Sequence, residues 1–288
     1  MATAEKLKEQ SQPHPMLRAE QSGPLLTLTL DAPQHRNSQV PSLWSALAQV
    51  GESLDPSVRV VLIRAEGPSF SAGLDRAMLT PEGMPGEPPI FALATGAPKA
   101  LEEALEQFQR GFSVWAQVPA VSIAAVQGHA IGAGFQLALA CDLRIVADDV
   151  AFAMRETSVG LVPDLAGTSS LVRAIGYSRA LEICATGRFV GAAEAVAVGL
   201  ASLAVPRAEL DSTARELADA ILGAPQAAVR ELKPLLLNAI DASPASQLKA
   251  EREAQMRLLT SMAMRAAAGH GKQAPRSGVV HPDDQNDG

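Results

Sequence analysis

The stretch VPAVSIAAVQGHAIGAGFQLALACDLRIVA, residues 118–147, decides the fold class. Residues 118–128 form a run of aliphatic and β-branched side chains that is typical of a strand buried on both faces. GFQLALAC (134–141) predicts a helix, and DLRIVA (142–147) predicts the next strand. Polar residues interrupt the apolar run and glycines punctuate it, so it does not predict a membrane span. A strand, a helix and a strand in this order indicate a layered α/β domain with mostly parallel pairing.

The same alternation of strands and helices extends toward the N-terminus. VRVVLIRA (58–65) has another buried-strand pattern, and residues 41–54 predict a helix with leucine and valine on one face. Two further strands are expected around the turn at 22–24. After residue 187, helical periods replace the strand patterns almost completely. We therefore expect four regions: a disordered tail (1–15), an α/β core (16–200), a helical C-terminal part (201–268) and a second disordered tail (269–288).

The composition of the 288-residue chain excludes several classes of function. Hydrophobic residues make up 47% and charged residues 19%, which is too apolar for a disordered protein. The 31 acidic residues outnumber the 24 basic ones, and the net charge of -7 would repel a nucleic-acid backbone. The first ten residues contain no apolar signal segment, so we expect a cytoplasmic protein that binds neither nucleic acid nor membrane. Cys141 and Cys184 are expected to be free thiols.

The sequence lacks the motifs of several common enzyme classes. It contains no G-x-x-x-x-G-K-[ST] phosphate loop, no H-E-x-x-H metal motif and no G-x-S-x-G nucleophile elbow. The five histidines are scattered, which argues against a metal site or a Ser-His-Asp triad. GAGFQL (132–137) provides two glycines of the dinucleotide fingerprint but has Leu137 in place of the third. We therefore expect no metal site and no NAD site.

Two turns of small residues follow buried strands, and they are the candidates for a ligand site. They are GPSFSAGLD (67–75) and GHAIGAG (128–134). Small side chains let a ligand approach the backbone amides, and the second turn opens a helix, whose N-terminus favours negative charge. Two such amides that converge on one oxygen would form an oxyanion hole. From the spacing alone, two ordinary glycine turns remain the alternative.

Four segments taken together carry a family resemblance. They are DAPQHRNS (31–38), FSAGLD (70–75), the segment 124–171 and GRFVGAAEAVAVGL (187–200). In this order they resemble the enoyl-CoA hydratase/isomerase family, the crotonase superfamily, over roughly residues 26–200. Because two separated motifs occur in the correct order, the resemblance is specific.

The resemblance implies a core of repeated ββα units wound as a spiral, with a helical C-terminal part that completes a homotrimer or a dimer of trimers. It also implies acyl-CoA thioester substrates, which need no further cofactor. In the family, two backbone amides hold the thioester enolate, and position assigns these amides to Ala72 and Ala133. Two preorganised donors can lower the barrier to enolate formation by several kcal/mol, since removal of a single such donor costs about 2.7–4 kcal/mol.

The resemblance also suggests which groups move protons. Hydratases of the family use two glutamates, and Glu156 occupies the position of the second, whereas Gln136 stands at the first. An amide can orient a water molecule but cannot exchange a proton near neutral pH. We therefore expect double-bond isomerisation with Glu156 as acid and base, ahead of hydration with Gln136 in place of one glutamate. A homologue that binds acyl-CoA without catalysis is a further alternative.

Asp164 is a second candidate carboxylate. The sequence resembles dienoyl-CoA isomerases and aryl-CoA dehalogenases at this position, although neither match is complete. Two carboxylates in a dry pocket would push their pKa values apart and leave one as a base and the other as an acid. The alternative is that Asp164 caps the helix expected to begin near Thr168.

The remaining predicted substrate contacts lie in the loops that carry the resemblance. Arg36 is in a loop similar to the adenine-contacting segment of the family. The small and polar residues of the two turns are expected to border the thioester: Ser71, Gly73, Asp75 and Gly132. His129 is expected to contribute backbone rather than its ring. The segment 80–98, rich in proline and glycine, is expected to border the acyl pocket.

Overall fold

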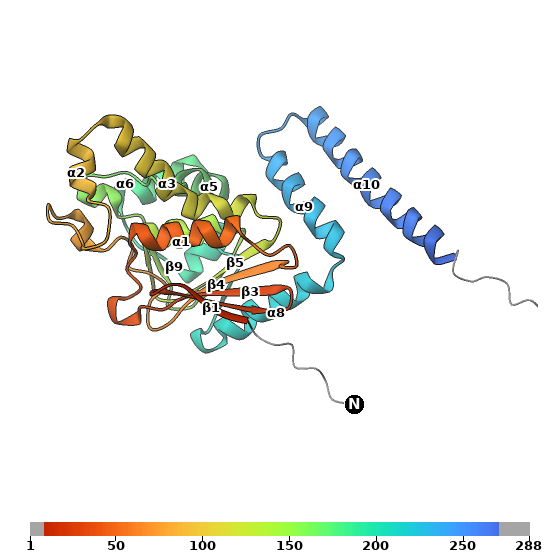
Figure 1. Cartoon of the computed structure of the whole chain (residues 1–288), viewed down its shortest axis with the longest axis horizontal. Coiled ribbons are helices and arrows are strands. Elements are labelled where there is room, and N and C mark those ends of the chain that lie inside the picture. Colours follow the sequence, from red (N-terminus) through yellow and green to blue (C-terminus); the bar gives the residue numbers. More distant parts are fainter. Residues whose placement is uncertain (1–8, 271–288) are drawn as a thin grey trace, which may run out of the picture. The chain divides into compact units, whose positions relative to one another are not determined.

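Seven strands form the main sheet of the structure, a computed structural model that describes residues 9–270 (Figure 1). Within these residues the strand order is β1-β2-β3-β4-β5-β7-β10. The first two pairings are antiparallel and the other four are parallel, which confirms the expected mostly parallel α/β sheet. The strands are β1 (Glu9–His14), β2 (Leu17–Ser22), β3 (Leu25–Leu30), β4 (Val60–Ala65), β5 (Val121–Val126), β7 (Leu143–Ala147) and β10 (Leu203–Val205).

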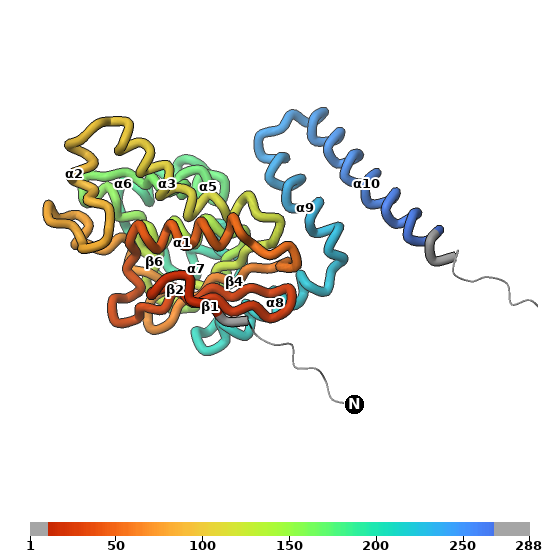
Figure 2. The backbone as a smooth tube through the Cα atoms, in the orientation of Figure 1, coloured from red at the N-terminus to blue at the C-terminus, as the bar shows by residue number. Residues whose placement is uncertain are grey.

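Alternating side chains bury both faces of this sheet. On β4, Val61 and Ile63 join a large apolar core that includes α1 (Pro41–Glu52), α3 (Pro98–Gln117) and α4 (Ala133–Ala140). Val60 and Leu62 point the other way, into a smaller core against α8 (Leu210–Gly223). Strand residues of period 2 thus contact helices on both sides. Figure 2 shows α1 and α8 on opposite sides of the strands.

A second, three-stranded sheet lies beside the second turn of small residues. It consists of β6 (His129–Ile131), β8 (Ala151–Ala153) and β9 (Val190–Gly191). An isolated parallel bridge joins Ser71 to Ala130 of β6. The bridge places the two turns that the sequence singled out next to each other.

Within the described residues, four further helices of six to ten residues complete the first part of the chain. They are α2 (Ile90–Thr95), α5 (Gly167–Ile175), α6 (Tyr177–Thr186) and α7 (Ala192–Ala197), with 3-10 turns at 33–35, 76–79, 156–159 and 207–209. The segment 80–98 is therefore not wholly irregular, since it contains α2. Met84 and Ile90 pack against the main core from this segment.

The boundaries of the predicted regions need correction. Residues 9–14, assigned to a disordered tail, form strand β1, whose polar residues are held by backbone pairing with β2. Near the other boundary, β10 pairs with β7, and α8 covers one face of the sheet, so the core continues beyond residue 200. The chain divides into compact units at Arg230 and Glu231 instead. Residues 1–8 and 271–288 lie outside the described part of the chain, as does most of the predicted second tail.

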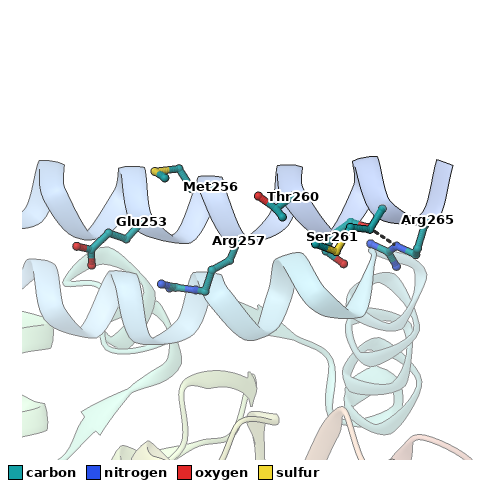
Figure 3. Close-up of a pocket in the computed structure, with 7 residues that line it drawn as sticks. Glu253, Met256, Arg257, Thr260, Ser261 and Arg265 are labelled. Carbon is teal, nitrogen blue, oxygen red and sulfur yellow. Dashed lines mark hydrogen bonds between the residues drawn. The ribbon is translucent and has the colours of Figure 1, made fainter. Parts of the chain in front are cut away.

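The second unit is helical within its described residues. It contains the later part of α9 (Gln226–Ala239) and the long α10 (Pro244–His270). Arg257 Nη2 lies 2.7 Å from Glu231 Oε2 and joins the two helices. Figure 3 shows a hollow lined by side chains of α10 alone, which are Glu253, Met256, Arg257, Thr260, Ser261, Met264 and Arg265. None of the predicted site residues lies in it.

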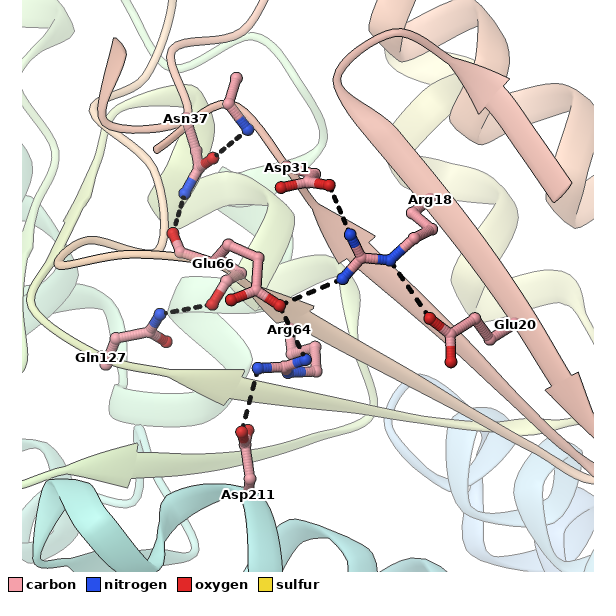
Figure 4. A network of polar contacts seen from close by, with 10 residues as sticks. Arg18, Glu20, Asp31, Asn37, Arg64, Glu66, Gln127 and Asp211 are labelled. Atoms are coloured by element: carbon pink, nitrogen blue, oxygen red, sulfur yellow. Dashed lines mark hydrogen bonds and ion pairs between the residues drawn. The ribbon is translucent and has the colours of Figure 1, made fainter. Parts of the chain in front are cut away.

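A polar network fixes the loop after β3 (Figure 4). Asn37 is buried, accepts a hydrogen bond from Ala32 N at 2.8 Å, and donates to Glu66 O and Ser69 O at 2.9 and 2.8 Å. The ion pairs beside it, centred on Arg18, are partly exposed and contribute little to stability. Asn37 therefore ties the 31–38 loop to the start of the first small-residue turn.

Candidate active site

Residues 70–75, the later part of the first turn, donate most of their backbone amides to acceptors within the protein. Four of the five amides from Ser71 to Asp75 donate within the protein. Their acceptors, in chain order, are His129 O (3.0 Å), Arg36 O (2.9 Å), Ser71 Oγ (3.1 Å) and Gln39 O (2.8 Å). The exception is Leu74, whose amide donates to no residue between 9 and 270. The turn therefore presents one free donor.

Strand-like pairing explains why the Leu74 amide is left free. Leu74 forms an isolated parallel bridge with Gln39. In a parallel bridge, the groups that bond to the partner belong to the residues on either side. Accordingly, Gly73 O accepts from Gln39 N at 2.7 Å, and Asp75 N donates to Gln39 O at 2.8 Å. The amide of Leu74 itself faces away from Gln39.

The prediction that Ala72 supplies an oxyanion donor is wrong for this structure. The Ala72 amide already donates to Arg36 O at 2.9 Å. Arg36 and Asn37 have left-handed backbone, with φ of 52° and 51°, and this bend brings the Arg36 carbonyl to the turn. Sequence reasoning missed Leu74 because FSAGLD shows where the small residues are but not how they pair with Gln39.

The second turn leaves its free amide at the start of a helix. Gly132 has a φ of 51° and donates its own amide to Ala153 O at 2.9 Å. Ala133 is the first residue of α4, and the first amides of a helix have no partner within it. Among residues 9–270 the Ala133 amide makes no hydrogen bond. The Ala133 amide is therefore free to bind a ligand atom, and its role as an oxyanion donor stays a prediction.

Gly73 allows the two turns to approach closely. Its φ is 86°, and a Cβ atom built on it would lie 2.5 Å from Ile131 O and 3.6 Å from Ala133 N. No side chain fits at that distance from a backbone carbonyl. The glycine therefore brings the residue before Leu74 against the start of α4, so that the free amides of Leu74 and Ala133 lie in neighbouring segments.

The carboxylate of Glu156 lies beside Gly132, the residue before Ala133. A Cβ atom on Gly132 would lie 3.2 Å from Glu156 Oε1. Glu156 Oε1 accepts a hydrogen bond from Gln136 Nε2 at 2.7 Å. Glu156 Oε2 is buried and has no hydrogen-bond partner in the described part of the chain. One oxygen of the carboxylate is thus held, and the other is free.

Burial makes Glu156 a stronger base than an ordinary glutamate. It raises the pKa of the carboxyl because the charged form is disfavoured away from water, and the charge of Asp164 adds to this rise. The hydrogen bond from Gln136 lowers the pKa, but burial dominates. The pKa of the Cys184 thiol is also raised, by burial first and then by the charge of Glu156.

The orientation of the Gln136 side chain is fixed by its surroundings. Gln136 is 1% exposed, and its Oε1 accepts from Leu165 N at 2.8 Å and from Gly167 N at 3.3 Å. Because both acceptor sites face amides, the NH2 group must face Glu156. Gln136 is therefore a neutral donor to Glu156.

Asp164 lies within electrostatic reach of Glu156 but is exposed. Partial burial raises the pKa of its carboxyl. Its backbone carbonyl accepts from Gln109 Nε2 at 2.8 Å, which fixes this part of the loop. The cap position of α5 is Ala166, without a side-chain hydrogen bond, so the alternative that Asp164 caps this helix is wrong.

Other predicted substrate contacts have their polar groups engaged within the protein. Ser71 is fully buried, and its hydroxyl makes three hydrogen bonds to protein groups. Asp75 accepts from Ala77 N at 3.0 Å and from Ser38 Oγ at 2.8 Å. The structure therefore assigns these two side chains to the support of the turn. Arg36 is exposed and forms no ion pair with any residue between 9 and 270.

No group of three or more His, Cys, Asp and Glu side chains within residues 9–270 is arranged to hold a metal ion. No helix in the same range is long and apolar enough to cross a membrane. His129 is exposed, and its ring packs edge-on against Phe189 with centroids 6.0 Å apart.

A parallel α/β core carries two adjacent turns with free amides and a carboxylate beside them, an arrangement that can bind an oxyanion next to a group that accepts a proton. Comparison with known proteins agrees. Residues 20–274 match the family model for enoyl-CoA hydratase/isomerase. The chain belongs to this family, the crotonase superfamily.

Individual relatives show how close the similarity is. A crystal structure of a putative enoyl-CoA hydratase from Thermobifida fusca, in complex with acetoacetyl-CoA, is 43% identical, with a TM-score of 0.83, and covers 85% of this chain and 95% of that one. The probable enoyl-CoA hydratase echA12 of Mycobacterium bovis is 36% identical over 257 residues, 85% of this chain and 86% of the relative. The probable mitochondrial enoyl-CoA hydratase 2 of Arabidopsis thaliana is 30% identical over 240 residues, 82% and 75% of the two chains.

Proposed function

We propose that this protein isomerises the double bond of an enoyl-CoA thioester. The observation that carries the proposal is the asymmetry around Glu156, whose Oε1 is held by Gln136 while Oε2 is buried and free. A 1,3-proton shift needs one group that removes a proton and returns it elsewhere. Glu156 provides such a group, and Gln136 cannot provide a second one.

In the proposed reaction, the amides of Leu74 and Ala133 bind the thioester oxygen. Glu156 Oε2 takes a proton from the α carbon of a 3-enoyl thioester, and the electron pair of the broken C–H bond moves toward the thioester oxygen. The protonated Glu156 then gives its proton to the γ carbon, which leaves the double bond between the α and β carbons. The proton is returned and no oxidant or cofactor is consumed.

The free energies involved are consistent with this division of labour. Each oxyanion donor contributes on the order of 2.7–4 kcal/mol when it is preorganised away from water. The raised pKa of Glu156 brings the carboxylate nearer to the operating pH, where general bases are most effective. Binding of the oxygen therefore belongs to the backbone, and proton transfer belongs to one side chain.

Hydration is the second candidate function. The names of the Thermobifida, Mycobacterium and Arabidopsis relatives favour it, since all three are described as hydratases. In that reaction Glu156 would activate the water molecule or protonate the α carbon, and Gln136 would stand in for the first glutamate. Isomerisation of a dienoyl-CoA with Glu156 and Asp164, and acyl-CoA binding without catalysis, are further alternatives.

The experiment offers purified protein 3-enoyl-, 3,5-dienoyl- and 2-enoyl-CoA in deuterated water. We expect deuterium at the α or γ carbon of an unsaturated product, because the proton on Glu156 exchanges with solvent. Formation of 3-hydroxyacyl-CoA alone would instead establish the hydratase. Tight acyl-CoA binding without turnover would establish a binding protein.

Self-association belongs to the same proposal. Residues of α10 that are large, apolar and exposed provide a surface that a second copy can cover: Met256, Leu259, Met262 and Met264. We expect a homotrimer or a dimer of trimers, and the mass of the purified protein in sedimentation equilibrium will test this.

A further inference from the structure

A chain of buried polar side chains lies directly behind the first turn. Trp44 Nε1 donates to Gln39 Oε1 at 2.8 Å, and Gln39 Nε2 donates to Ser71 Oγ at 3.0 Å. Ser71 Oγ donates to Asn37 O at 2.7 Å and accepts from Gly73 N at 3.1 Å. Gln39 and Ser71 are both 0% exposed. This series of hydrogen bonds leads from helix α1 to the turn that carries the free Leu74 amide.

The hydroxyl of Ser71 has no bonding capacity left. A hydroxyl has one proton to donate and two lone pairs, and all three are used here. An apolar side chain would avoid the cost of burying a polar group, which is high whenever one of its partners is missing. The polar chain is therefore a specific arrangement, whose bonds fix the path of the backbone around Ser71 and Gly73.

The bonds of Gln39 and Ser71 enclose the position of Leu74. The backbone of Gln39 holds Gly73 O and Asp75 N, on either side of Leu74. The side chain of Gln39 holds Ser71, whose hydroxyl holds Gly73 N. The direction of the Leu74 amide is thus set by Gln39 twice, once through its backbone and once through Ser71.

We propose that Ser71, held by Gln39, is a positioning residue that aims the Leu74 amide at the substrate oxygen. The inference rests on the proposed function in one respect, namely that Leu74 N binds the thioester oxygen. Ser71 touches no substrate itself. It acts by keeping Gly73, and with it the next peptide, in the orientation that the oxyanion requires.

The test compares Ser71→Ala with Ser122→Ala, a matched control. Ser122 is also 0% exposed, and its hydroxyl donates to Asp142 Oδ2 and accepts from Asp142 N, both at 2.9 Å. Both variants lose a buried hydroxyl, but only Ser71 braces the turn. We expect Ser71→Ala to lower kcat by about 10- to 100-fold with KM changed less than about threefold, since small misplacements cost rates of this order.

A second measurement tests the oxyanion hole without catalytic turnover, through the enolate fraction of a bound ligand. Bound acetoacetyl-CoA ionises to an enolate when donors stabilise its oxygen, and the enolate has its own ultraviolet absorbance. We expect the enolate fraction to fall in Ser71→Ala and to stay at the wild-type level in Ser122→Ala. An equal enolate fraction in Ser71→Ala and wild type would overturn the inference alone. Absence of the enolate from the wild-type complex would overturn the proposed function as well.

A double variant shows whether Ser71 acts through Leu74. Leu74→Pro removes the amide hydrogen, so Ser71→Ala should cause little further loss of kcat in that background. An equal fold-loss in both backgrounds would mean that Ser71 acts elsewhere, and would overturn the inference. Thermal unfolding of each variant identifies losses that come from unfolding, and the enolate measurement on Ser71→Ala stands even if the double variant does not fold.

Discussion

The two turns of the site each present one free amide, but they do so by different means. The first turn, residues 70–75, is braced by side chains and by pairing with Gln39, and only Leu74 is left over. The second turn needs no such bracing, because the Ala133 amide is free as the first residue of a helix. The second turn also leads into α4, which carries Gln136 and through it holds Glu156. In the proposed mechanism the first turn therefore serves binding alone, whereas the second serves binding and proton transfer.

The largest effect is expected on the side of the second turn. Glu156→Gln removes the proton acceptor but keeps the side-chain shape, and we expect kcat to fall by about 10²–10⁴-fold, the usual contribution of a general base. Deuterium incorporation into the α and γ carbons measures this loss directly. Activity close to wild type would show that the proton acceptor is another group.

The same variant should be more stable than the wild type at neutral pH. The pKa of Glu156 is raised in the folded state, so its ionisation opposes folding. The stability that it contributes is complete below the ordinary glutamate pKa and declines as the pH rises through the native pKa. Glu156→Gln removes this decline, and urea unfolding at pH 5 and pH 8 should show a difference from wild type that grows with pH.

The next effect tests the first turn. Leu74→Pro deletes the amide hydrogen, and we expect kcat to fall by about 10²–10³-fold, as in other cases where one oxyanion donor is lost. Leu74→Ala keeps the amide and is the matched control, with kcat within a few-fold of wild type. If the two variants were equally active, the free donor of the first turn would have no catalytic role.

A smaller effect is expected from substitution of Gln136, which lies on α4 and donates to Glu156. Gln136→Glu places a second carboxylate beside Glu156 and raises the pKa of the pair. We expect hydration of 2-enoyl-CoA to rise several-fold relative to isomerisation, measured as the ratio of the two products. Gln136→Leu controls for the loss of the hydrogen bond to Glu156. An unchanged product ratio would contradict the idea that the amide suppresses hydration.

The smallest effect concerns pH. The base must be ionised, so kcat/KM should rise with pH through the raised pKa of Glu156. The negative charge of Asp164 contributes to that rise in pKa, and Asp164→Asn should therefore move the profile toward lower pH. Profiles of the two proteins on one substrate measure the shift. A shift in the opposite direction would mean that Asp164 affects Glu156 by another route.

The difference between the turns also explains which parts of the site the sequence could predict. The strands at 60–65 and 121–126 and the start of α4 follow from local patterns, and the resemblance located Ala133, Glu156 and Gln136. The free amide of the first turn depends on the bridge to Gln39, a contact between separate segments, and so Ala72 was chosen wrongly. For the same reason the polar edge strand β1 was mistaken for a tail, since its stability comes from its neighbour.

The two amides that bond to Gln136 Oε1 have a consequence for how this chain can change. Leu165 N and Gly167 N fix a loop to the same side chain that fixes the base. A carboxylate at position 136 would still accept from both amides, yet it would lose the donor that Glu156 relies on. A change from glutamine to glutamate at this position therefore keeps the hydrogen bonds to the loop but removes the one that holds Glu156. The gain in hydration expected of Gln136→Glu would therefore come with weaker support of Glu156, which a second substitution that supplies a donor to Glu156 would restore.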